Sequence, residues 1–279
     1  MDALREKSIR IIIDTAIKSF ADGFELRHNS DVNNPTGTIN SKKNNCFISV
    51  LGDEFIFYSA FVRSFDSSFG NLLENIGNQI AKFSYQTNKT IHSYILTEQT
   101  QHISNLLDKY EDNICKPDKY EDNICKPAKE HYENFFVVQP KDVTSFLTKH
   151  KCDNWFYDEK TKTHYLIELK AGGDLDNKKA KSEKLALLKE YFMLKNVIPH
   201  DQNIYIYFAT AYNKFGEENF WHQANVERFF SKDELLIGKN YWNFVCNDEN
   251  GFNIVFDQYK ISSLYIKNAL KRIRTVYQC

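Results

Sequence analysis

The sequence predicts an α/β protein with a central mixed β-sheet flanked by helices, plus helical additions at the N- and C-terminal ends. Two observations predict this fold. Past Pro140 the pattern runs strand, turn, strand, helix, strand, and a helical segment precedes it, an order typical of an α/β layer. The chain has 279 residues with only 10 Gly and 5 Pro, so it can bury a large core with long elements.

The composition is that of a globular protein and excludes several classes. Hydrophobic residues at 42% and charged residues at 26% exclude disorder of the whole chain. The 36 Lys and Arg are balanced by 37 Asp and Glu, which excludes a globally cationic nucleic-acid binder but not a local basic groove. No apolar run is long enough for a membrane span, the N-terminus lacks signal-peptide features, and the six cysteines have no paired spacing. We therefore expect a cytoplasmic protein with free thiols and no membrane partner.

The N-terminal part is expected to be helical. Apolar residues at helical spacing predict a helix over residues 3–22, which Gly23 would end. The polar stretch 28–45 predicts a mobile loop. The apolar segment 46–63 fits either a buried helix or two strands, because periodicity alone does not separate them.

The next segments alternate between helix and strand. A helix is expected over 69–84 with Ser67 or Ser68 as its cap, then a short strand over 92–96 and a helix over 101–110. The decapeptide DKYEDNICKP then occurs twice in tandem, from Asp108 to Pro127. Two copies are too few for a solenoid. We interpret the repeat as a duplication tolerated in a surface connection, the alternative being an arm that contacts a partner.

The central block carries the sheet. Strands are expected over 152–158, 163–170 and 203–212, with a long helix within 177–195 and a terminal helix around 264–276. No linker separates the segments, so we expect one domain. Its parts would be a helical N-terminal part (1–65), a core containing the inserted repeat (66–215), and a C-terminal extension (216–279) for DNA binding or dimerisation.

The residues that indicate chemistry lie in the hairpin of this block. Glu168 and Lys170 are two apart on one strand and therefore share a face. If Asp158 pairs with Thr163 across the polar turn, Asp153 stands opposite Glu168. Directly opposed residues have Cβ atoms about 4.5 to 5.5 Å apart, so the two carboxylates could share one divalent cation.

This pattern predicts a Mg²⁺ site for phosphodiester hydrolysis. Mg²⁺ is commonly bound by one or two carboxylates together with water and phosphate oxygens. A neighbouring lysine can position the attacking water and neutralise charge that develops on the phosphate. The alternative is a surface hairpin whose charges form an exposed cross-strand pattern.

The same residues resemble a known family. Asp153, a strand, and then Glu168-Leu169-Lys170 resemble the PD-(D/E)XK nuclease motif, although no proline precedes the Asp and Asn154 follows it. The resemblance extends to TdeIII-type restriction endonucleases, which cut duplex DNA at GGNCC. It is carried by four blocks in order: RSFDSSFGNLLENIG (63–77), KCDNWFYDEKTKTHYLIELKAGG (151–173), YFATAYNKFGE (207–217) and DELLIGKNYWNFV (233–245).

The resemblance implies a PD-(D/E)XK core and a role for each matching residue. Asp153 and Glu168 would bind the metal, and Lys170 would position the water. Glu74 matches the acidic residue that many of these nucleases supply from the preceding helix; the alternative is a solvated helix charge. The segment AGGDLDN after Lys170 departs from the proline-rich turn expected there, and the decapeptide repeat is foreign to the pattern.

Two further groups are candidates for DNA contact. Lysines at the start of the helix after the motif could hold phosphates, although a solvated helix face explains them as well. Residues after the next strand could line a DNA cleft or form an ordinary turn. The candidates are Lys178, Lys179, Lys181, Lys184, Tyr212, Asn213 and Lys214.

The function expected from these patterns is that of a Mg²⁺-dependent type II restriction endonuclease. It would bind double-stranded DNA at a short palindrome as a homodimer, because the target has two-fold symmetry. A cognate DNA methyltransferase is expected in the same restriction-modification system. The alternatives are a repair or junction nuclease of the same fold, and a DNA-binding protein without catalysis.

Overall fold

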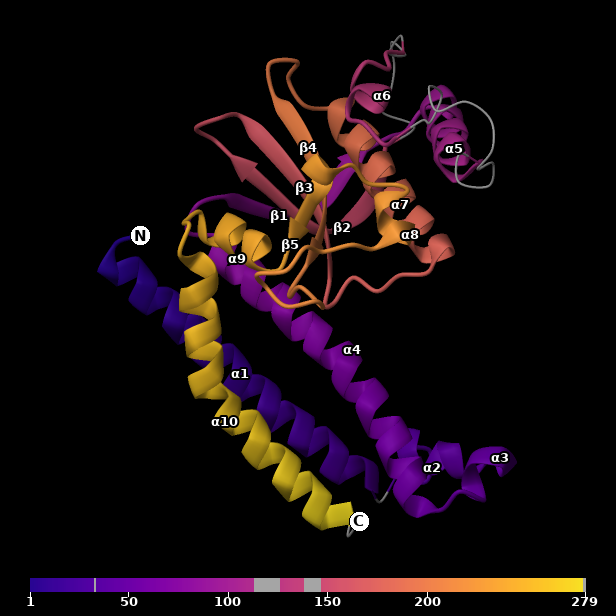
Figure 1. Cartoon of the computed structure of the whole chain (residues 1–279), viewed down its shortest axis with the longest axis vertical. Coiled ribbons are helices and arrows are strands. Elements are labelled where there is room, and N and C mark those ends of the chain that lie inside the picture. Colours follow the sequence, from indigo (N-terminus) through magenta and orange to yellow (C-terminus); the bar gives the residue numbers. More distant parts are fainter. Residues whose placement is uncertain (33, 113–125, 138–146, 278–279) are drawn as a thin grey trace. The chain divides into compact units, whose positions relative to one another are not determined.

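The computed structural model describes residues 1–32, 34–112, 126–137 and 147–277, and the chain divides into two compact units (Figure 1). One unit comprises residues 1–80 and 248–279, and the other comprises residues 81–247. Segment 66–80, which the sequence assigns to the core, thus belongs to the first unit. Segment 216–247, assigned to the C-terminal extension, belongs to the second.

The first unit is helical. Its helices are α1 (Ala3–Val32), α2 (Thr38–Lys43), α3 (Cys46–Ser49), α4 (Asp53–Ala81) and α10 (Gly251–Tyr277). Helices α1 and α10 pack side by side along their length (Figure 1). Phe24 of α1, Phe57 and Ala60 of α4, and Ile273 of α10 form a buried apolar cluster that joins the three long helices.

Several predictions for this unit are wrong. Helix α1 does not end at Gly23 but continues to Val32, because Phe24 directly after the glycine is buried, which offsets the roughly 1 kcal/mol that glycine costs in a helix. The loop expected over 28–45 contains the end of α1 and all of α2. Of the two alternatives for segment 46–63, the structure has the helical one, as α3 and the start of α4. Because α4 already begins at Asp53, Ser67 and Ser68 lie inside a helix rather than at its cap.

The second unit contains the predicted mixed sheet. Its elements are β1 (Gln86–Ser93), α5 (Thr97–Asp112), α6 (Glu130–Glu133), β2 (Thr148–Asp158), β3 (Thr163–Lys170), α7 (Asn177–Lys195), β4 (Asn203–Thr210), α8 (Ala224–Glu227), η3 (Lys232–Glu234), β5 (Leu235–Ile237) and α9 (Lys239–Cys246). The strands lie in the order β1-β2-β3-β4-β5. Strands β1, β2 and β3 pair antiparallel, whereas β3, β4 and β5 pair parallel.

Helices cover both faces of this sheet. The main core lies between the sheet and α7, with Leu166, Ile206 and Phe208 of the strands against Leu188 of α7. On the other face, Phe244 of α9 packs against Tyr85, Tyr165 and Tyr207. Helix α5 packs on α7. The α/β class expected from the sequence is therefore confirmed.

The sequence located the central elements well and the outer ones less well. Strand β3 and helix α7 have the expected limits, and the strand expected over 92–96 begins earlier, at Gln86. The terminal helix is longer than expected, beginning at Gly251. No helix among the described residues combines the length and the apolar character needed to cross a membrane.

The decapeptide repeat falls partly outside the described residues. Residues 113–125 are not described. Residues 108–112, the first half of the first copy, form the end of α5 rather than a surface connection, and Tyr110 is buried with its Oη 2.9 Å from His131 Nδ1. The expectation of a purely surface segment is therefore wrong for this half.

Candidate active site

The β2–β3 hairpin has the register expected from the sequence. Asp158 pairs with Thr163, and the same register continues to the pair of Asn154 and Ile167. One more step places Asp153 opposite Glu168. The two carboxylates are close enough for the charge of Asp153 to act on the ionisation of Glu168.

The pairing of strands β1 and β2 is irregular around Asp153. Asn88 of β1 pairs with Trp155, but Thr90 pairs with Lys151. One residue of β1 therefore stands opposite three residues of β2, at positions 152–154. Bulges of this kind redirect side chains and are enriched next to active sites. Here both Cys152 and Asp153 interact with a carboxylate of α7.

Glu168 is a buried carboxylate in an unusual electrostatic setting. Its side chain is 11% exposed. Burial raises the pKa of Glu168 to about 8; the ammonium of Lys170 opposes this shift, and the charges of Asp153 and Glu183 add to it. The site therefore concentrates negative charge around a carboxyl group whose burial makes ionisation costly.

Lys170 is held between two carboxylates. Its Nζ lies 2.5 Å from Glu168 Oε1 and 2.9 Å from Glu183 Oε1. Burial lowers the pKa of Lys170, but the two carboxylates outweigh this and raise it overall, so the side chain carries its positive charge. Glu183 comes from α7, and no motif in the sequence singles it out, because only the packing of α7 on the sheet brings it to the strand.

A second carboxylate of α7 also reaches the hairpin. Glu190 is 7% exposed, and its Oε1 lies 3.1 Å from His150 Nε2. Burial and the charge of Asp153 raise the pKa of Glu190 to about 8, and a hydrogen bond with Cys152 opposes the shift. Sequence reasoning missed Glu190, which appears in the sequence as one of several charges on a long helix.

The two carboxylates of the hairpin are a donor set that fits a magnesium ion. Among the described residues, no three His, Cys, Asp or Glu side chains converge as a complete metal site. Mg²⁺ needs no such cage, since one or two carboxylates with water and phosphate oxygens suffice. Asp153 and Glu168 supply two carboxylate ligands on one hairpin, and a cation bound between them would favour the ionised form of Glu168.

Glu74 lies in another part of the fold. It belongs to α4 in the first unit, whereas Asp153, Glu168 and Lys170 belong to the second. Its backbone carbonyl accepts a hydrogen bond from Asn78 Nδ2 at 3.1 Å. Within the second unit, the structure brings together Asp153, Glu168 and Lys170.

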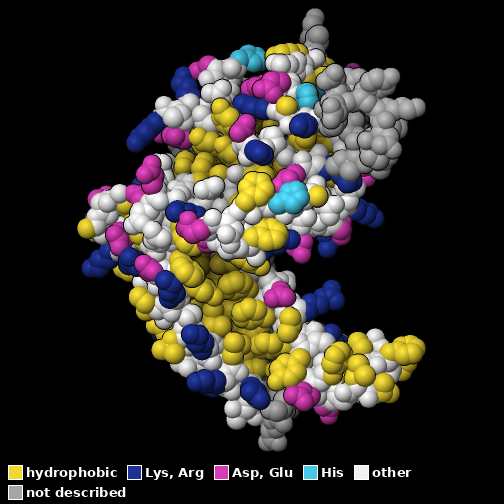
Figure 2. Space-filling view, in the orientation of Figure 1, with side chains coloured by type: hydrophobic (Ala, Val, Ile, Leu, Met, Phe, Trp, Pro, Cys, Tyr) yellow, Lys and Arg dark blue, Asp and Glu magenta, His cyan; other side chains and the backbone are white. Residues whose placement is uncertain are grey.

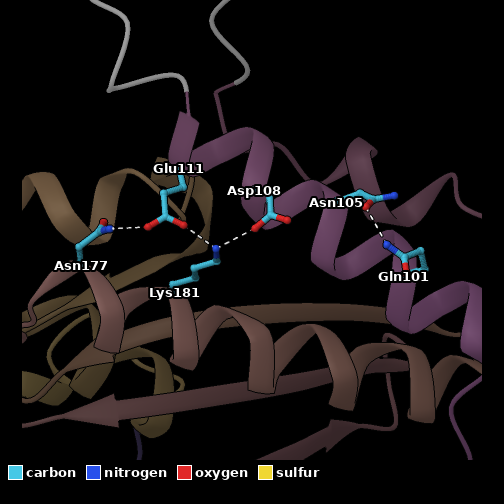
Figure 3. Close-up of polar contacts among 6 residues, drawn as sticks. All are labelled: Gln101, Asn105, Asp108, Glu111, Asn177 and Lys181. Atoms are coloured by element: carbon cyan, nitrogen blue, oxygen red, sulfur yellow. Dashed lines mark hydrogen bonds and ion pairs between the residues drawn. The ribbon is translucent and has the colours of Figure 1, made fainter.

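The lysines at the start of α7 have different surroundings. Lys178 and Lys179 are exposed. The ammonium of Lys181 instead lies between Asp108 and Glu111 of α5, at 2.8 and 2.5 Å (Figure 3). Lys181 thereby joins the two helices, and a DNA phosphate would have to compete with two carboxylates for it.

The residues after β4 form a turn that is held by hydrogen bonds. Asn213 is buried, its Nδ2 donates to the Asn219 carbonyl, and its Oδ1 accepts from the backbone of Phe215. Lys214 Nζ lies 3.1 Å from Asp174 Oδ1. The Asn213 side chain therefore serves the turn, while the ion pair of Lys214 is partly exposed. Tyr212 is 48% exposed.

Comparison with known proteins identifies the family of the chain. No curated protein and no solved structure matches the chain at a significant level. A family model described as "Type II restriction endonuclease, HinfI" matches residues 5–263, which span both units and the whole hairpin. The chain therefore belongs to the HinfI family of type II restriction endonucleases, which are site-specific deoxyribonucleases.

Proposed function

We propose that the protein hydrolyses DNA phosphodiester bonds in a Mg²⁺-dependent reaction at a PD-(D/E)XK site formed by Asp153, Glu168 and Lys170. The observation that carries this proposal is the register of the β2–β3 hairpin, which places Asp153 opposite buried Glu168. The Lys170 ammonium lies beside that carboxylate, at 2.5 Å. Two carboxylate ligands for a metal and an ammonium beside them are groups suited to metal-assisted hydrolysis of a phosphodiester.

Each residue has a distinct task in this reaction. Asp153 and Glu168 would hold the metal together with phosphate oxygens of the DNA, and a bound Mg²⁺ would polarise the phosphate as a Lewis acid. Lys170 would orient the attacking water by hydrogen bonding and stabilise negative charge on the phosphate. Water forms a new bond to phosphorus and loses a proton to solvent, while the bond from phosphorus to one deoxyribose oxygen breaks and that oxygen takes up a proton from solvent.

The DNA target and the further residues of this chain that would act on it belong to the same proposal. The resemblance to TdeIII-type enzymes makes the palindrome GGNCC the first site to test. Glu74 is proposed as a further acidic residue of the catalytic set. Lys178, Lys179, Lys181, Asn213 and Lys214, together with segment 216–279, are proposed to contribute to DNA binding or dimerisation. A cognate methyltransferase would protect the cell's DNA in the cytoplasm.

We further propose that the enzyme acts as a homodimer. A palindrome presents the same sequence on both DNA strands. The described residues of one chain form one hairpin site of this kind, so two copies of the chain would be needed to cut both strands. An exposed apolar surface supports an interface in the first unit (Figure 2). There, around α3 and the start of α4, Phe47, Val50 and Leu51 are 83%, 80% and 57% exposed.

The direct test is digestion of unmethylated phage DNA by the purified protein, with Mg²⁺ or with EDTA, followed by a gel and sequencing of the fragment ends. We expect discrete Mg²⁺-dependent fragments whose ends define one site. The Glu168→Ala variant, purified in the same way, controls for contaminating nucleases. A smear, or cutting of junctions only, would support a repair nuclease, and intact DNA in both conditions would support a binding protein.

A further inference from the structure

Glu183 supplies a carboxylate next to the proposed site, and the proposed reaction assigns no role to it. Its Oε1 lies 2.9 Å from Lys170 Nζ, and its side chain is 22% exposed. It comes from α7, not from the hairpin. Leu187, four residues on and therefore on the same row of the helix, is part of the main core. The packing of α7 on the sheet thus holds the Glu183 carboxylate against the ammonium.

Lys170 has two carboxylate partners for one positive charge. In the structure Glu168 is the nearer one, at 2.5 Å. In the proposed reaction, however, the Glu168 carboxylate also faces a cation, and a carboxylate whose charge is shared with a cation attracts an ammonium less strongly. A lysine anchored only by Glu168 would lose its fixed position when the reaction needs it.

We propose that Glu183 is a positioning residue that keeps the Lys170 ammonium in place while Glu168 binds the divalent cation. This inference rests on the proposed function, because Glu183 acts only through Lys170. The neighbouring lysines of α7 have partners of their own: Lys181 pairs with two carboxylates of α5, and Lys184 pairs with Glu234. Glu183 also stands on a different element from Glu168, so a change at the hairpin leaves it in position.

The first test compares Glu183→Ala with the matched control Ser182→Ala, an exposed neighbour on the same helix. We expect the single-turnover rate of cleavage to fall about 10- to 100-fold for Glu183→Ala, the usual effect of removing a residue that orients the groups around a metal site. DNA affinity without divalent cations should stay unchanged. Glu183→Gln should lose less activity, because its amide oxygen still accepts a hydrogen bond from Lys170.

The second test needs neither metal nor activity. The metal-free Glu168→Ala protein, in which Lys170 has lost its nearer carboxylate, is treated with an amine-reactive reagent, and labelling of each lysine is measured by peptide mass spectrometry. Adding Glu183→Ala to this protein should increase the labelling of Lys170 while buried Lys184 stays protected. Cleavage at the wild-type rate, or unchanged labelling of Lys170, would overturn the inference. Labelling of Lys184 as well would also overturn it, because Glu183 would then serve the general stability of the unit.

Failure of this inference can be distinguished from failure of the proposed function. If the wild type cuts no DNA, or if Lys170→Ala cuts like the wild type, the proposed site is wrong and the role of Glu183 is wrong with it. If the wild type cuts, Lys170→Ala does not, and Glu183→Ala cuts normally, only the role of Glu183 is wrong.

Discussion

Lys184 Nζ lies 2.6 Å from Glu234 Oε1, and the two side chains are 0% and 5% exposed. The same oxygen accepts a hydrogen bond from Tyr132 Oη at 2.8 Å. Burial lowers the pKa of Lys184, and the charge of Glu234 opposes that shift. Lys184 therefore joins α7 to the segment before β5. It is neither a phosphate contact nor a solvated helix residue, the two alternatives that the sequence offers.

This ion pair predicts a large loss of stability when one partner is removed. Glu234→Ala leaves a buried ammonium without its counter-charge, so we expect the free energy of unfolding to fall by about 3–5 kcal/mol. The double variant Lys184→Met with Glu234→Leu should lose less, because no charge is left buried. Urea unfolding measures both, with the exposed Lys179→Ala as control. Wild-type stability of Glu234→Ala would show that the pair contributes nothing.

Alanine variants at Asp153, Glu168 and Lys170 should each reduce DNA cleavage by about 10³-fold or more, because they remove a metal ligand or the group that stabilises the developing charge. The fold should survive, since these side chains serve the site rather than the apolar core. Cleavage rates and melting curves measured on the same preparations check both statements. Normal cleavage by any one of the variants would remove that residue from the catalytic set.

The buried carboxylate of Glu190 predicts a pH dependence of stability. Its pKa is raised to about 8 from 4.5, so between these values the folded protein holds a proton that the unfolded chain has released. The contribution of Glu190 to stability then falls as the pH rises from 5 to 8, by about 1.4 kcal/mol for each pKa unit of the shift. His150, Cys152 and Asp153 of β2 face this carboxylate.

Glu190→Gln should remove this contribution, because the amide does not titrate. Urea unfolding at pH 5, 7 and 8.5 measures the effect. We expect the variant to be more stable than the wild type at pH 8.5, with the difference shrinking toward pH 5. Parallel stability profiles of the two proteins would show that Glu190 does not titrate in this range.

The turn after Lys170 requires glycine at one of its two glycine positions. Gly173 has φ +68°, and a Cβ there would lie 2.5 Å from Thr210 Cγ2. Gly173→Ala should therefore destabilise the protein by about 2 kcal/mol and reduce cleavage by displacing Lys170.

Gly172→Ala is the matched control for that turn. A Cβ at Gly172 would meet only the end of the half-exposed Tyr212 side chain, which can move aside. Thermal unfolding of the two variants should thus separate them clearly. Equal stability would mean that the backbone at Gly173 accepts a side chain without strain.

Deleting ten residues of the decapeptide repeat should leave folding and cleavage unchanged. Removal of either copy yields the same chain, which retains one complete DKYEDNICKP. The contacts of Asp108 and Glu111 with Lys181, and of Tyr110 with His131, can then still form (Figure 3). Tyr110→Ala, by contrast, should cost about 3–5 kcal/mol, because it removes a buried aromatic ring. Loss of folding on the deletion would show that both copies are needed.

The sequence by itself determined the central strands of the sheet, helix α7 and the register of the hairpin. The residue pattern of this block predicted strand β3 and helix α7 with their observed limits. The length of the turn between Asp158 and Thr163 then placed Asp153 opposite Glu168. Both are local properties, because a strand's side chains alternate and a short turn allows few registers.

Only the tertiary structure decided the rest. Gly23 lies inside a helix because Phe24 is buried against other helices, and Lys184 is buried because Glu234, fifty residues further along the chain, meets it. Glu183 and Glu190 reach the hairpin because α7 packs across the sheet. Such contacts join segments that are distant in the sequence, so they depend on packing and desolvation that no local pattern encodes.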